Sequence, residues 1–187
     1  GPVTGESGLQ LVANHGWNDR LTGPCDDLVV AGGVGLHTAV SDTSLIDWIR
    51  RTSKRAERVV SICSGSFVLA EAGLLDGLNA TTHWARFDQF AQEFPQVQLD
   101  RDALYIRDGN VLTSAGVTAG IDLALSLVED DHGAEAAQIV ARHLVVFLRR
   151  PGGQSQFASP TWNKPVEAEP IRLAQSIIRS HPNSDLS

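Results

Sequence analysis

The stretch Arg58-Val-Val-Ser-Ile-Cys-Ser-Gly65 decides the fold of this chain. Residues 58–62 form an apolar run of the length expected for a strand buried within a parallel sheet. A helical pattern follows at once and continues to Ala72, where Gly73 ends it. The sequence therefore places Cys63 at a sharp turn from a buried strand into a helix.

Strand and helix patterns alternate on both sides of this turn, which predicts an α/β fold with a mostly parallel sheet covered on both faces. The chain has 187 residues, of which 42% are hydrophobic, enough for one such domain and an appendage. Strands are expected at residues 9–12, 27–31, 58–62, 79–82, 104–107 and 111–113, and helices at 41–55, 65–72, 84–94, 118–128, 134–148 and 170–179.

A stretch rich in Gly and Pro divides the chain after residue 150. We expect a domain at residues 1–150, a linker at 151–168, and the start of a truncated second domain at 169–187. The chain contains no methionine, so Gly1 is not a natural start and we expect a fragment.

The charge balance excludes several classes of protein. Lys and Arg number 15 against 22 Asp and Glu, and a chain with a net charge of −7 lacks the positive field that nucleic-acid binders use.

No apolar run approaches the ~18 residues of a membrane span, and no signal pattern opens the chain. Two cysteines make no disulfide framework, so we expect a cytoplasmic protein. The histidines lack metal-ligand spacing, and we expect neither a metal nor a cofactor.

The turn at Cys63 is suited to chemistry. It directs the side chain to the carboxyl edge of the sheet, where open α/β folds bind ligands, beside unpaired backbone N–H groups that begin with Ser64. Helix N-termini also favour the thiolate form of a cysteine. The alternative is that Cys63 is simply a small buried hydrophobic residue.

Several longer motifs resemble the ThiJ/PfpI class of glutamine amidotransferase-like domains, and more narrowly the N-terminal domains of AraC-type transcriptional regulators. The motifs are Val59–Gly65, Ala72–Gly77, Ala80–Trp84, Asp108–Gly116, Gly120–Leu125 and the closing phrase Leu148–Phe157. The resemblance implies a flavodoxin-like, three-layer α/β/α sandwich over residues 1–150 and the beginning of a helix-turn-helix DNA-binding domain after the linker.

The resemblance also implies a site. In enzyme members of the class the elbow cysteine is the nucleophile and a histidine 20 positions later assists it, which matches Cys63 and His83. These two are therefore the candidate catalytic residues, although the His83 ring could instead merely pack on Trp84. The Gly32-Gly33-Val34 loop matches a second backbone donor, or is a plain turn at a strand end. The expected ligand-binding residues are Gly33, Val34, Cys63, Ser64, His83, Trp84, Gly116, Val117 and Thr118.

Two departures from the class pattern bear on catalysis. Amidotransferase and protease-like relatives have a histidine directly after the cysteine, where this chain has Ser64. Many others have an acid near the end of a first strand, but that strand and its helix, which should precede Val3, are absent here. We expect the missing segment to exist in the natural protein, since the class places that strand centrally in the sheet.

The leading hypothesis is a cytoplasmic, ligand-sensing domain of an AraC-type regulator. It would bind a small, possibly nitrogen-containing effector such as a betaine, carnitine or arginine, act as a homodimer, and reach DNA through a C-terminal domain not fully present here. One alternative is a cysteine-dependent hydratase or hydrolase of the isonitrile-hydratase kind. A third is a dimerisation module with a vestigial elbow.

Overall fold

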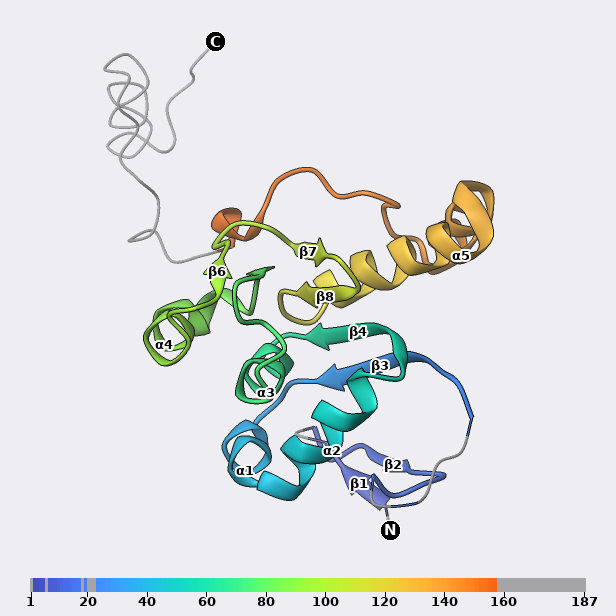
Figure 1. The fold of residues 1–187 in the computed structure, drawn as a ribbon. Coiled ribbons are helices and arrows are strands. Elements are labelled where there is room, and N and C mark those ends of the chain that lie inside the picture. Colours follow the sequence, from blue (N-terminus) through green and yellow to red (C-terminus); the bar gives the residue numbers. More distant parts are fainter. Residues whose placement is uncertain (1, 6, 18, 20–22, 158–187) are drawn as a thin grey trace, which may run out of the picture. The chain divides into compact units, whose positions relative to one another are not determined.

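A computed structural model describes residues 2–5, 7–17, 19 and 23–157. The chain divides into residues 1–156 and 157–187, and the fold below is that of the first unit. Its central sheet has the order β3-β4-β8-β7, in which the first three strands are parallel and the last is antiparallel (Figure 1). These strands are β3 (Cys25–Ala31), β4 (Ala56–Ile62), β8 (Val111–Ser114) and β7 (Tyr105–Asp108). The predicted α/β class and mostly parallel sheet are confirmed.

One face of the sheet is covered by helices that share a large apolar core. Helices α2 (Thr43–Ser53) and α3 (Gly65–Glu71) lie directly on β3 and β4, and α1 (Leu36–Ser41) and α4 (Phe87–Glu93) add residues to the same core. Helix α2 begins at Thr43, two residues after the expected start at residue 41, because Asp42 caps it: Asp42 Oδ1 accepts hydrogen bonds from the N–H groups of Ser44 and Leu45. Ile46 and Ile49 on its inner side are buried. The apolar spacing of α2 therefore determines which side of this helix packs against β3 and β4.

The opposite face is covered by α5 (Ala119–Leu144), whose Leu123 packs with Val60 and Leu112. Two separate helices were expected here, and the helical stretch Ala119–Leu144 is indeed interrupted by a kink at Gly133, which takes a non-helical φ of 84°. The helix ends at Leu144, before the expected residue 148, because Val145 adopts a left-handed conformation. In its first half, Leu123 and Leu125 are buried, whereas Ile121 is 39% exposed.

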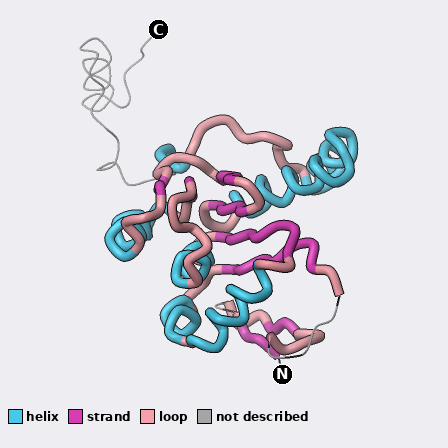
Figure 2. Tube along the Cα trace, in the orientation of Figure 1, coloured by secondary structure: helices cyan, strands magenta, loops and turns pink. Residues whose placement is uncertain are grey.

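Smaller elements complete the first unit (Figure 2). A hairpin of β1 (Pro2–Thr4) and β2 (Gln10–Val12) precedes β3, and β5 (Asn79–Ala80) pairs in parallel with β6 (Gln98–Leu99). Two 3-10 turns are η1 (Trp84–Arg86) and η2 (Gln154–Gln156). Among the described helices, none combines the length and apolarity needed to cross a membrane.

Turn η2 changes the expected domain boundary. The linker was predicted to start at residue 151, but η2 packs on the first unit, and Gln154 is only 2% exposed. Polar, Gly-flanked sequence is typical of a linker, and its local pattern gave no indication that one glutamine is buried. The remaining linker residues and the helix expected at 170–179 lie outside the described residues.

Candidate functional site

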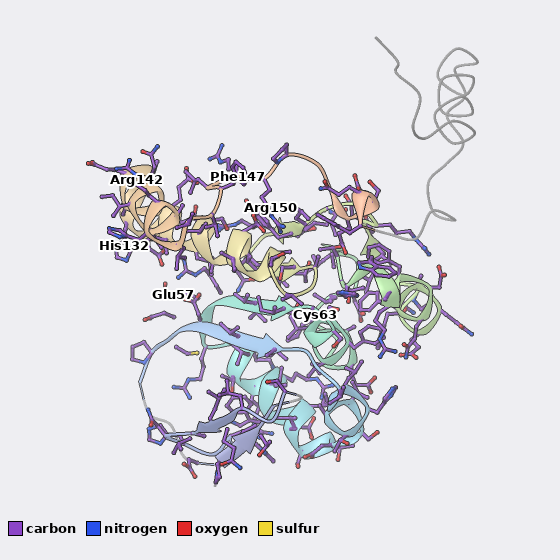
Figure 3. All side chains as sticks on the ribbon, turned by 180° about the vertical axis from the view of Figure 1, so that it is seen from behind. Glu57, Cys63, His132, Arg142, Phe147 and Arg150 are labelled. Carbon is purple, nitrogen blue, oxygen red and sulfur yellow. The ribbon has the colours of Figure 1, made fainter. Side chains whose placement is uncertain are left out.

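Cys63 occupies a strained turn at the carboxyl end of β4 (Figure 3). Its φ is 58°, a left-handed conformation that costs about 1–2 kcal/mol for a residue with a side chain. Its backbone N–H donates to the carbonyl oxygens of Ser114 (3.0 Å) and Ala115 (3.3 Å), and its own carbonyl accepts from Thr82 Oγ1 (3.2 Å). In contrast to its backbone, the half-buried sulfur has no hydrogen-bond partner among the described residues. The predicted elbow is thus held by its backbone, and its thiol is uncommitted.

The glycine loop after β3 lies directly against the elbow. A Cβ atom on Gly32 would fall 2.5 Å from Ser64 Oγ and 2.6 Å from Ser64 N, so only glycine permits this approach. The N–H of Gly33, expected to serve a ligand, instead donates to Ser64 Oγ at 3.1 Å. Val34 is 70% exposed. The Ser64 hydroxyl therefore occupies the Gly33 N–H, and a ligand would have to displace that hydroxyl to bind this donor.

His83 approaches the same elbow from the segment after β5. Its Nδ1 accepts a hydrogen bond from Ala85 N–H (3.2 Å), which assigns the proton of the neutral ring to Nε2. Burial lowers the pKa of His83 from its ordinary value, and the positive charge of Arg86 lowers it further. The ring also lies beside that of Trp84, with centroids 5.4 Å apart. His83 is therefore neutral near pH 7.

Gly116 lies next to both the His83 ring and the backbone of the Cys63 elbow. A Cβ atom on Gly116 would lie 2.0 Å from His83 Cδ2 and 2.8 Å from Nε2, so the imidazole rests on this backbone. The preceding residue, Ala115, accepts the hydrogen bond from Cys63 N–H. Two predicted groups, the elbow and the histidine, thus meet at the turn that follows β8.

The rest of that turn is more exposed than a binding wall would be. Val117 has a left-handed φ of 48° and is 80% exposed. The hydroxyl of Thr118 accepts from Arg150 Nη1 (3.2 Å), and Arg150 forms an ion pair with Asp122 at 2.5 Å. The Asp122 side chain is only 7% exposed. Sequence reasoning missed this pair, because its partners are 28 positions apart and follow no motif.

Sequence reasoning also missed a set of buried polar side chains beneath the site. They are Ser66, Thr81, Thr82, Thr113 and Gln154, which hydrogen-bond to one another or to nearby backbone. The two adjacent threonines before His83 were the available signal, since neither residue favours full burial without a partner.

No described cluster resembles a metal site: within the ranges that the structure covers, no three His, Cys, Asp or Glu side chains are grouped as ligands. Cys25 lies at the start of β3 and packs against the core. A shallow depression on α1 and its junction with α2 is lined by His37, Thr38, Ser41 and Asp42, and contains no predicted site residue.

The chemistry at the elbow is that of an uncommitted thiol near a neutral imidazole. No described carboxylate hydrogen-bonds to His83.

Known proteins resemble the chain over most of its length. Isonitrile hydratase from Pseudomonas putida is 41% identical over 143 residues, 76% of this chain and 60% of that protein. Two HTH-type transcriptional regulators of Pseudomonas aeruginosa are also similar. CdhR is 37% identical over 151 residues (81% of this chain, 44% of CdhR), and ArgR is 33% identical over 167 residues (89% and 49%). The chain thus spans roughly half the length of these curated relatives.

Solved structures agree with the sequence relatives. A ThiJ/PfpI family protein from Pseudomonas syringae superposes with a TM-score of 0.70 at 30% identity, covering 96% of this chain and 71% of that one. The DJ-1/PfpI family matches residues 1–130. The chain belongs to the DJ-1/PfpI family.

Proposed function

We propose that residues 1–156 form the ligand-sensing domain of an AraC-type transcriptional regulator, with a small-molecule effector bound at the Cys63 elbow. The alignment with the regulator ArgR carries this proposal. It spans 167 residues, whereas the first unit has only 156, so at least 11 residues (167 − 156) of the segment after Gln156 have a counterpart in that regulator. By length alone, neither the 143-residue alignment with isonitrile hydratase nor the 151-residue alignment with the regulator CdhR requires that segment.

The geometry at the elbow also provides contacts that a small ligand could use. A cysteine nucleophile is ordinarily activated by a base that a third group orients. Here the Nδ1 atom of His83 is occupied by a backbone N–H of its own turn, and no described carboxylate orients the ring. The uncommitted thiol, the neutral imidazole and the amides near Gly33 instead offer polar contacts to a small ligand. A ligand that displaces the Ser64 hydroxyl would gain access to the Gly33 N–H.

Thermal unfolding of the 187-residue chain tests the proposal. The probes are glycine betaine, carnitine and arginine, which represent the small nitrogen-containing effectors that the regulator resemblance implies. A ligand present at 100 times its dissociation constant stabilises by ~2.7 kcal/mol, or about 5–10 °C in Tm for a chain of this size. We expect one probe to raise Tm and Cys63→Ala to reduce that rise. If no probe shifts Tm at millimolar concentration, the proposed effector class is wrong.

The alternative is an isonitrile hydratase, supported by the 41% identity and the strained elbow. This reaction adds one water to an isonitrile and gives an N-substituted formamide. Incubation with cyclohexyl isocyanide, followed by formamide detection, separates the two functions. Turnover that is lost in Cys63→Ala would establish the enzyme and overturn the sensor proposal. The absence of Cys63-dependent turnover would support the sensor.

A further inference from the structure

Thr82 ties the elbow to the segment that carries His83. Its Oγ1 donates to the carbonyl oxygen of Cys63 at 3.2 Å and accepts from Ser66 Oγ at 2.8 Å. Thr82 is fully buried, so no water competes for this hydroxyl. Strained conformations persist where the surrounding contacts determine them, and the Cys63 carbonyl is one of those contacts. The placement of Thr82 and the conformation of Cys63 therefore depend on each other.

Gln154, which is distant in sequence, holds the other side of Thr82. Its side-chain Nε2 donates to the carbonyl oxygens of Thr82 (3.1 Å) and Ala103 (2.9 Å) and to Thr81 Oγ1 (2.9 Å). The Gln154 side chain thus ties η2 to Thr81 and Thr82, the two threonines that follow β5. The route from Gln154 to the Cys63 carbonyl passes through one residue.

The orientation of this amide follows from its partners. The carbonyl oxygens of Thr82 and Ala103 can only accept hydrogen bonds, so the nitrogen must face them. The oxygen Oε1 is then buried without a partner in the described part of the chain. A buried acceptor that neither protein nor water satisfies is destabilising. The two N–H groups of the Gln154 amide are thus shared among three acceptors, while Oε1 has no described partner.

We propose that Gln154 is a positioning residue that couples the conformation of the Cys63 elbow to the docking of η2. When the elbow changes, the Thr82 carbonyl moves relative to Nε2 and the docked turn is weakened. A docked turn conversely holds Thr82 and the elbow in place, because coupling between two sites is reciprocal. Since η2 directly precedes residue 157, this coupling would pass the state of the site to the following segment. That use as a signal rests on the proposed function, but the coupling itself requires no ligand.

A double-mutant cycle on the 187-residue chain tests the coupling. Cys63→Gly relaxes the strained elbow, and Gln154→Met removes the amide while keeping a side chain of similar length. The readout is backbone amide exchange in η2, where Gln154 N–H donates to Asp102 O (2.7 Å) and Ser155 N–H to Asp102 Oδ1 (2.9 Å). We expect Cys63→Gly to change η2 exchange by about threefold when Gln154 is present, and not in the Gln154→Met background.

The matched control is Gln156→Met, because among the described residues the Gln156 amide hydrogen-bonds only to the carbonyls of Pro151 and Gly153 beside its own turn. The cycle of Cys63→Gly with Gln156→Met should be additive. A merely structural Gln154 would weaken η2 equally in both elbow backgrounds, and that additive result would overturn the proposal. If Gln154→Met does not fold, Thr82→Val removes the other end of the link and must give the same non-additivity. Because no arm contains a ligand, a failed effector screen leaves this result unaffected.

Discussion

Substitution of Gly116 by alanine should displace His83 from the elbow. The added Cβ would lie 2.0 Å from His83 Cδ2, whereas ordinary contact begins at 3.4 Å, so the ring must move by about 1.4 Å (3.4 − 2.0). The backbone of Gly116 lies outside the left-handed region, and alanine is therefore allowed there. Since His83 is only partly buried, the ring can move outward.

Two opposing effects set the size of this change. Overpacking costs about 1–3 kcal/mol, while replacing glycine restricts the unfolded chain and returns about 0.4–1 kcal/mol, which leaves a net loss of about 1 kcal/mol for a ring free to move. The pKa of His83 should rise toward its ordinary value of 6.5, because the burial that lowers it is relieved. Urea unfolding measures the first quantity, and an NMR titration of the His83 ring measures the second.

The matched control is Gly35→Ala, whose Cβ would meet nothing within 4 Å. We expect this variant to keep the wild-type titration of His83 and to be neutral or slightly more stable. If Gly116→Ala also leaves the His83 titration unchanged, the ring does not rest on residue 116. The assignment of His83 to the elbow would then be wrong.

Three further predictions concern the same region. The lowered pKa of His83 means that the unfolded chain binds more protons than the folded chain between that pKa and 6.5. The free energy of unfolding should therefore rise with pH through this window. Urea titrations should show that this rise with pH is weaker in His83→Gln. Cys63→Gly should be more stable than Cys63→Ala by about 0.5–1 kcal/mol in the same assay, because only alanine retains the strain at φ 58°, and the reverse order would contradict it. Arg150→Met should lose about 2–4 kcal/mol by leaving the buried Asp122 carboxylate unpaired, whereas Arg149→Met, at a side chain 77% exposed, should change stability by less than ~0.5 kcal/mol.

The central sheet and the elbow were predictable because local patterns determine them. The apolar run before Cys63 is readable within a few residues, and the structure places strand β4 there. The left-handed conformation of Cys63 itself follows from the sharp turn that the strand-to-helix pattern requires.

The parts that escaped prediction depend on contacts between distant residues. Gln154 reaches Thr82 across 72 positions, and its polar, Gly-rich surroundings are typical of a linker. The occupation of Gly33 N–H by Ser64 depends on how closely two loops approach, which no spacing encodes.

Strand β3 has a consequence for handling the protein. It ends the strand order of the sheet, and Val29 at its middle is 55% exposed. Within the described residues, nothing pairs with its outer backbone groups, and such an open edge recruits strands from other molecules. The edge is therefore able to accept a further strand, from the same chain or from another molecule, and a lysine in place of Val29 would disfavour the second.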